Sequence, residues 1–281
     1  MKNTPSPKLV ADGLAFAEAP RWHQGELWFS DFYTHKVCRV SADGAVIAVH
    51  DVPGQPSGLG WLPDGRLLLV SMTDRRLLRH DPAGLVMVAD LSQHAPCHCN
   101  DMVVDRQGRA YIGNFGFDLI GRAPVQPTVL LLVTQDGQVR VVADDLLFPN
   151  GCVITPDGST LIVAETFGKR LTAFSIAVDG SLSDRRVWAD LGEASPDGIC
   201  LDGEGAIWVA SPPTSTFLRV RQGGQVTDSI GVGNQAIACA LGGASGHTLY
   251  LVTGRVGSAE KSLARRLGAI LALEVEVPMP S

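Results

Sequence analysis

Short runs of β-favouring apolar residues recur along the whole chain, and a glycine introduces each of them. Six runs align on their glycines, which lie 40 to 50 residues apart: 25–31, 65–71, 108–114, 158–165, 205–211 and 246–253. The pairs Asp64-Gly65 and Asp157-Gly158 are typical of the two-residue turns that join antiparallel strands. A repeat of this length indicates an array of small β-sheets.

Each repeat holds more than one such segment. A short apolar segment precedes the glycine, as in 59–62 and 152–154, and a third and often a fourth strand follow, as in 170–176. About four strands in roughly 47 residues is the pattern of a propeller blade. We therefore predict an all-β fold, a six-bladed β-propeller with about four antiparallel strands per blade, formed by residues 1–281 as a single domain.

The two ends of the chain indicate how the ring closes. The N-terminal run 8–11 has no blade of its own, and a long apolar segment, 269–277, ends the last repeat. Because an open ring would expose sheet edges, we predict that the N-terminal strand is the outer strand of the C-terminal blade. The best helical candidate, residues 258–267, is short and charged, and is interpreted as a long loop or one helical stretch. A two-domain α/β fold is therefore not supported.

Composition excludes several function classes. The 281 residues are 45% hydrophobic and 19% charged, and 23 basic against 29 acidic residues give a net charge of −6. No run rich in Lys or Arg occurs, so we expect neither nucleic acid nor a membrane as a partner. No apolar stretch is long enough to span a bilayer. Six thinly spread cysteines and no visible secretion signal favour a cytoplasmic protein with reduced thiols.

Polar residues share one phase of the repeat. Near the start of the first strand of their repeats stand Glu18, Asn100, Asn150 and Asp197. In a propeller this strand lines the central channel, so these side chains are predicted to converge near the channel axis. Four oxygen-bearing side chains around one point suit a hard cation such as Ca²⁺, Mg²⁺ or Mn²⁺. Asn-Gly and Asp-Gly are also ordinary turn sequences, but two crowded carboxylates need a cation or a proton between them, which favours a metal site.

An ordered set of segments then suggests a family. The segments are 16–22, 27–31, Asn100-Asp101, 148–151, 195–200, 242–243 and 249–251. Together they resemble the senescence-marker protein/regucalcin/gluconolactonase family. The resemblance implies one divalent metal ion held by Glu18, Asn150 and Asp197, with the ion left open among Ca²⁺, Zn²⁺, Mg²⁺ and Mn²⁺. It also implies that Asn100 contacts metal or substrate, that the reaction is hydrolysis of a lactone ring, and that Asp197 serves as general base as well as ligand.

The chain departs from the family pattern next to Asn100. Sugar-lactone members often carry an arginine two positions earlier, where this chain has His98 and loses the bidentate guanidinium. We assign substrate binding to Asn100, His98 and Asp101; for Asp101, holding its own strand and facing the site from its flank both stay open. The aromatic residues in 114–118 are interpreted either as a pocket wall or lid, or as a loop packed on its blade. Three cysteines are expected to be buried core thiols on inner strands: Cys152, Cys200 and Cys239.

The predicted function is a metal-dependent lactonase, a hydrolase that opens a sugar-derived or other small lactone with metal-activated water. Two alternatives stay open. One is a phosphotriesterase-like hydrolase at the same metal ion, and the other is a non-catalytic propeller that binds calcium or a partner protein. The sequence does not indicate the oligomeric state.

Overall fold

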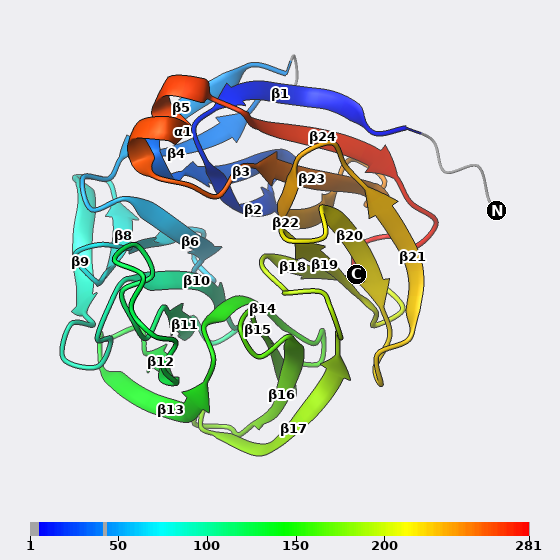
Figure 1. Ribbon diagram of the computed structural model, residues 1–281. Helices are drawn as coiled ribbons and strands as arrows, with labels where there is room; N and C mark the ends of the chain where they lie inside the picture. The colour runs from blue at the N-terminus through cyan, green and yellow to red at the C-terminus, as the bar shows by residue number, and fades with distance from the viewer. Residues whose placement is uncertain (1–5, 42–43, 281) are drawn as a thin grey trace.

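The computed structural model is a ring of six antiparallel sheets, each with four strands, around a central channel (Figure 1). The structure describes residues 6–41 and 44–280. The sheets follow one another round the ring in chain order, and their first strands contact each other around the axis. The predictions of an all-β fold and of six four-stranded blades are confirmed.

The strands have the following bounds. The first blade holds β2 (Ala17–His23), β3 (Glu26–Asp31), β4 (Lys36–Val40) and β5 (Val46–Asp51). The second holds β6 (Pro56–Trp61), β7 (Leu67–Ser71), β8 (Arg76–Asp81) and β9 (Gly84–Asp90). The third holds β10 (Cys99–Val104), β11 (Ala110–Asn114), β12 (Thr128–Val133) and β13 (Val139–Leu146). The fourth holds β14 (Pro149–Ile154), β15 (Thr160–Glu165), β16 (Arg170–Ile176) and β17 (Leu182–Asp190). The fifth holds β18 (Ile199–Leu201), β19 (Ile207–Ser211), β20 (Thr216–Val220) and β21 (Val226–Gly231).

The sixth blade joins both ends of the chain. It holds β22 (Gln235–Gly242), β23 (Thr248–Gly254), β24 (Gly268–Glu274) and, as its outer strand, β1 (Lys8–Leu14). The register runs antiparallel from Lys8 opposite Ala272 to Leu14 opposite Gly268. The predicted closure by the N-terminal strand is thus confirmed, while β24 ends three residues before the predicted 277.

Two short helices lie outside the sheets. Helix α1 (Ala259–Arg265) shows that the helical alternative was the right one for residues 258–267. It begins at Ser258, whose side chain accepts a hydrogen bond from the Lys261 amide, a typical N-cap. The other is the 3₁₀ turn η1 (Phe32–Thr34). Neither helix of this described part is long and apolar enough to cross a membrane.

The repeat glycines explain the spacing of the pattern. Each lies in the turn between the first and second strand of its blade, and all six have φ between +72° and +85°: Gly25, Gly65, Gly108, Gly158, Gly205 and Gly246. A residue with a side chain is strained in that region, whereas glycine is not. The core then forms between blades, as where Val70 and Leu77 of the second blade pack in one cluster with Ile112 and Leu131 of the third.

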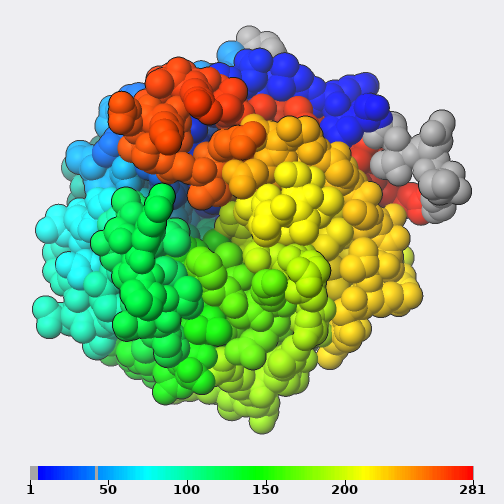
Figure 2. All heavy atoms as spheres, in the orientation of Figure 1, coloured from blue at the N-terminus to red at the C-terminus, as the bar shows by residue number. Residues whose placement is uncertain are grey.

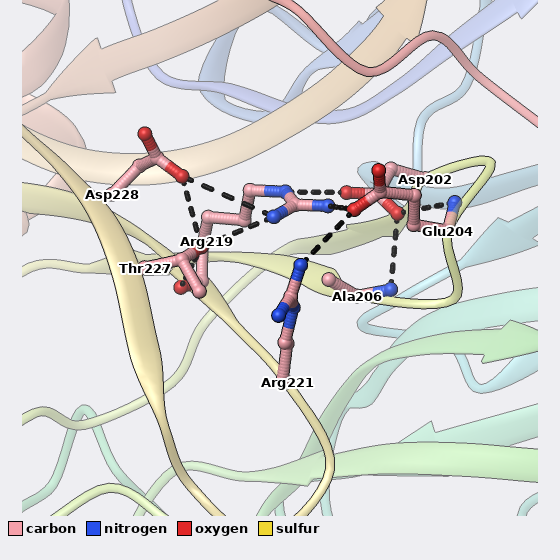
Figure 3. A network of polar contacts seen from close by, with 7 residues as sticks. All are labelled: Asp202, Glu204, Ala206, Arg219, Arg221, Thr227 and Asp228. Carbon is pink, nitrogen blue, oxygen red and sulfur yellow. Dashed lines mark hydrogen bonds and ion pairs between the residues drawn. The ribbon is translucent and has the colours of Figure 1, made fainter.

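A buried ion pair ties the strands of the fifth blade together (Figure 3). Asp202, in the turn before β19, accepts hydrogen bonds from the amides of Glu204 and Ala206 at 2.9 and 3.0 Å. Nε of Arg219 on β20 donates to the other Asp202 oxygen at 2.6 Å, and the Asp202 side chain is fully buried. Nη1 of Arg219 donates to Thr227 on β21 at 3.1 Å. The pair therefore connects the inner turn with the two outer strands.

Removing Asp202 is expected to destabilise the fold. Asp202→Ala removes the buried acceptor of the Arg219 guanidinium and of the Glu204 and Ala206 amides, so the free energy of unfolding should fall by about 3–5 kcal/mol. Glu204→Ala is the matched control, because Glu204 binds the same Arg219 but is 52% exposed; its loss should change stability by at most about 1 kcal/mol. Urea unfolding measures both. Equal losses in the two variants would contradict this account of the network.

Candidate active site and metal centre

The starts of the inner strands meet at one mouth of the channel, and they are irregular there. Register shifts interrupt the pairing of five inner strands near this mouth: Glu18/Arg21, Pro56/Leu59, Cys99/Met102, Pro149/Cys152 and Ala236/Ala238. In the fifth blade the inner strand has only three residues, and Asp197 precedes it. Bulges re-aim side chains and are frequent next to active sites. The bulges thus lie at the starts of the inner strands, where the repeat predicted the polar residues.

Asn150 and Asp197 come from neighbouring blades and are in contact. Nδ2 of Asn150 donates to Oδ1 of Asp197 at 2.5 Å, and both residues are buried. The same Nδ2 approaches Oγ1 of Thr166 at 3.2 Å, and that hydroxyl donates to the Pro196 carbonyl at 2.7 Å. Thr166 therefore connects the segment of Asn150 with the segment of Asp197 through hydrogen bonds. Thr166 was not identified from the sequence.

Glu18 lies close enough to these residues for their charges to act on it. Its Oε2 accepts a hydrogen bond from the Ala19 amide at 3.2 Å. Burial, followed by the negative charges of Asp197 and Asp101, raises the pKa of Glu18 well above its usual value. A buried carboxyl group that resists ionisation beside other negative charges indicates a place where a cation would be favourable.

Asp197 has the same electrostatic signature. Burial raises the pKa of Asp197 to about 7, and the charge of Asp101 adds to this effect, while the hydrogen bond from Asn150 opposes it. Two carboxylates and an amide are oxygen donors that hard divalent cations prefer. Among residues 6–41 and 44–280 no group of three or more His, Cys, Asp and Glu side chains is arranged to hold a metal. The residues fit a metal centre of mixed carboxylate and amide type, which stays a prediction.

The three predicted substrate-binding residues have different surroundings. Asn100 is buried, and its Nδ2 donates to the Pro149 carbonyl at 3.2 Å, which brings it beside Asn150. The carboxylate of Asp101 accepts hydrogen bonds from Nη2 of Arg21 at 2.6 Å and from the Met102 amide at 2.8 Å. Two roles were left open for Asp101, holding its own strand and facing the site. The structure shows contacts of the first kind, with Arg21 and the Met102 amide.

Arg21 lies between the polar mouth and the opposite end of the channel. Its guanidinium donates to the carbonyls of Leu59 at 3.2 Å and Met102 at 2.9 Å, so it joins the first three inner strands. On its far side Arg21 lines a cavity of about 310 Å³ at the opposite mouth. The three inner-strand thiols line that cavity rather than the polar site: Cys152, Cys200 and Cys239.

His98 and a group of aromatic rings form one wall of the polar mouth. The His98 ring is half-buried beside Phe115, with ring centroids 5.5 Å apart. Its Nδ1 is buried and has no hydrogen-bond partner within the described residues. Phe115 stacks on Phe148 at 4.6 Å, two residues before Asn150. The aromatic residues of 114–118 thus form a wall whose rings are also packed together.

Buried polar residues at the ends of the second strands support the site from behind. Such a residue is the last or, in the sixth blade, the last but one of the second strand in every blade: Asp31, Ser71, Asn114, Glu165, Ser211 and Thr253. Asp31 accepts hydrogen bonds from the Phe16 and Ala15 amides at 2.8 and 3.2 Å, and Glu165 accepts one from Leu147 at 2.9 Å. These contacts fix the segments that lead to Glu18 and Asn150. The signal in the sequence was a polar residue closing every β-rich run.

Backbone strain marks the same two segments. Ala19, next to Glu18, has φ +46°, and Phe148, two residues before Asn150, has φ +62°. Non-glycine residues in this region cost of order 1–3 kcal/mol and cluster at functional sites. The hydrogen bonds that Asp31 and Glu165 accept from backbone amides hold these segments in place.

Comparison with known proteins agrees with this fold. The model of the SMP-30/Gluconolactonase/LRE-like region matches residues 16–255. Pentonolactonase XacC of Haloferax volcanii is 25% identical over 287 aligned positions, which cover 95% of this chain and 94% of that protein. A 6-deoxy-6-sulfogluconolactonase of Pseudomonas putida is 25% identical over 279 positions, covering 96% and 94%. The crystal structure of regucalcin from Agrobacterium tumefaciens, described as a calcium-binding protein, superposes with a TM-score of 0.82 at 22% identity, covering 98% and 95%.

Proposed function

Because the chain belongs to the SMP-30/gluconolactonase/LRE-like family, we propose that it hydrolyses a lactone ring at the polar mouth of its channel. Two relatives that are named as lactonases match this chain over nearly their whole length, which supports an enzyme of this kind. The observation that carries the proposal is the contact of Asn150 with Asp197 beside Glu18, which brings residues of three different blades together.

One divalent cation would be held by Glu18, Asn150 and Asp197. A structural relative described as calcium-binding supports a divalent ion without specifying which one. Carboxylate and amide oxygens accept Ca²⁺, Mg²⁺ and Mn²⁺, and carboxylates also bind Zn²⁺. When bound, such an ion supplies a Lewis acid for the ester carbonyl and lowers the pKa of water.

Asp197 acts as the general base in this proposal. The hydrogen bond from Asn150 orients its carboxylate. Asp197 takes a proton from water as the water oxygen attacks the carbonyl carbon of the lactone. The ring C–O bond then breaks, and the leaving oxygen receives that proton from Asp197. The product is the open-chain hydroxy acid.

Asn100 and His98 orient the substrate. Asn100 is a neutral amide beside Asn150, so it can bind a substrate oxygen without adding charge to a crowded site. Nδ1 of His98, which has no hydrogen-bond partner among the described residues, is proposed as a second polar group for the lactone. Asp101 acts through its ion pair with Arg21, as a positioning residue.

A panel of lactones tests the proposal. Their hydrolysis is measured at constant pH from the acid that is released, with divalent cations added. Turnover of at least one lactone above the spontaneous rate is expected. Turnover of a phosphotriester but of no lactone would instead support the phosphotriesterase-like alternative. Calcium binding with no turnover of either substrate class would support the non-catalytic propeller.

A further inference from the structure

Resting on the proposed function, we infer that the preferred substrate is a lactone with an apolar alkyl or aryl substituent, rather than a polyhydroxylated sugar lactone. The inference concerns which side chains surround the reacting ring. It stands on the aromatic wall, on the shortage of free polar groups and on exposed apolar side chains at the rim of the same mouth.

The aromatic wall extends outward from the ligand segments. Phe148 contacts Phe117 with ring centroids 5.9 Å apart and Phe167 at 5.3 Å, and Phe117 contacts Phe167 at 5.5 Å. Phe167 directly follows Thr166, which binds Asn150. The rings therefore continue from the polar site to the surface, where Phe167 is 41% exposed. Such a wall offers stacking and burial to an apolar group.

The apolar lining is not confined to one side. A single contiguous cluster includes residues that flank the mouth in five blades: Phe16, Phe32, Met72, Phe115, Phe148 and Ile237. Phe16 lies two residues before Glu18 and packs on Phe32 at 5.3 Å. These side chains are themselves buried, so the carboxylates at this mouth are set in an apolar layer that reaches into five blades.

Few polar groups remain for hydroxyls. Asp101 is taken by Arg21, and Nδ2 of Asn150 donates to both Asp197 and Thr166. Nδ2 of Asn100 donates once, to Pro149, which leaves one N–H for a substrate oxygen. His98 adds one ring nitrogen that lacks a partner within the described chain. A sugar lactone carries several hydroxyls, and each one buried without a partner weakens binding. The polar groups suffice for the ester but not for a set of hydroxyls.

The rim of the mouth carries exposed apolar side chains among charged ones. The segments after β11, β15 and β23 lie on this face, because each follows a strand end paired with the start of an inner strand. They carry six of the exposed large hydrophobic residues: Ile120, Val125, Phe167, Val256, Leu263 and Leu267. Figure 2 shows a hollow between the segment after β11, in green, and the segment with α1, in orange. A long apolar substituent that leaves the ring can therefore contact apolar side chains on this rim, with Phe167 nearest in sequence to the ligand segments.

The test compares δ-lactones with alkyl substituents of rising length, together with glucono-δ-lactone. We expect kcat/KM to rise about 3- to 4-fold per methylene, the equivalent of one buried CH₂, and to exceed that for glucono-δ-lactone. Phe167→Ala should lower kcat/KM for the long-chain substrate about tenfold and leave the unsubstituted ring within about twofold. Phe167 is partly exposed, so this variant should fold.

Val178→Ala is the control, since Val178 is 99% exposed in the turn between β16 and β17 at the opposite end of the fourth blade. It should change neither substrate. A preference for glucono-δ-lactone, or equal losses for both ring types in Phe167→Ala, overturns the inference and leaves the lactonase proposal standing. If no lactone is turned over, the proposed function fails. Calorimetry with a long-chain alkyl hydroxy acid then decides separately: binding that Phe167→Ala weakens supports the apolar site, and absence of binding overturns it.

Discussion

Replacing Asp197 with asparagine is expected to lower kcat/KM for lactone hydrolysis by about 10²- to 10⁴-fold, the range that a positioned general base contributes. Asparagine keeps the shape of the side chain and an oxygen that can accept the hydrogen bond from Asn150. It removes the proton acceptor and one negative charge of the proposed metal centre. Steady-state kinetics on the best lactone of the panel measures the loss. A rate within about twofold of the parent protein would contradict the role given to Asp197.

The loss should not come from unfolding. Burial raises the pKa of Asp197 to about 7 in the folded protein, above the usual value of about 3.9 in an unfolded chain. For an acid, such a raised pKa makes the ionised folded form unfavourable, so this residue lowers stability as the pH rises from about 4 through 7. Asp197→Asn removes that effect, and at pH 8 without divalent ions it should melt at the same temperature as the parent or higher. Asp228→Asn, an exposed position on the outer strand of the same blade, is the control that should leave kcat/KM unchanged.

Much of the fold could be predicted because its chemistry is local and repeated. Gly65 and Gly158 stand in turns that need a positive φ, and the same need recurs in all six blades. The position of β1 could be predicted because Lys8–Leu14 is an apolar segment without a sheet of its own, and one edge was left to cover. Helix α1 was less certain, since a seven-residue helix has too few turns to leave a clear periodic pattern.

The site could be predicted only in part. The phase of the repeat, which is a property of the chain in one dimension, predicted that Glu18, Asn100, Asn150 and Asp197 lie together. The family resemblance then selected three of them as metal ligands, and that selection stays a prediction. Thr166 and Arg21 could not be found this way, because their roles depend on which side chains the bulges turn toward the axis. A bulge changes side-chain direction at a single residue, and the apolar pattern does not record it.

Divalent cations are expected to stabilise the chelator-treated protein and to restore its activity. A ligand that binds only the folded state at 100 times its Kd adds about 2.7 kcal/mol, which corresponds to a rise in Tm of roughly 5–10 °C for a chain of this length. Glu18→Gln should abolish most of that rise, because the proposed site has two carboxylates and one amide and this change removes one of the carboxylates. Glu193→Gln makes the same chemical change at an exposed position in the segment before Asp197, and it should keep the full rise.

The effect of pH gives this prediction a signature that a nonspecific salt effect lacks. The pKa of Glu18 is raised well above its usual value, mainly by burial and then by the charges of Asp197 and Asp101, and the pKa of Asp197 is about 7. A cation must therefore displace protons from these carboxylates, so the rise in Tm at a fixed cation concentration should shrink as the pH falls from 8 to 6. Differential scanning fluorimetry with Ca²⁺, Mg²⁺, Mn²⁺ and Zn²⁺ measures it. If none of these ions raises Tm, or if Glu18→Gln responds like Glu193→Gln, Glu18 is not a metal ligand and the hydrolysis has to be explained by Asp197, Asn100 and His98 alone.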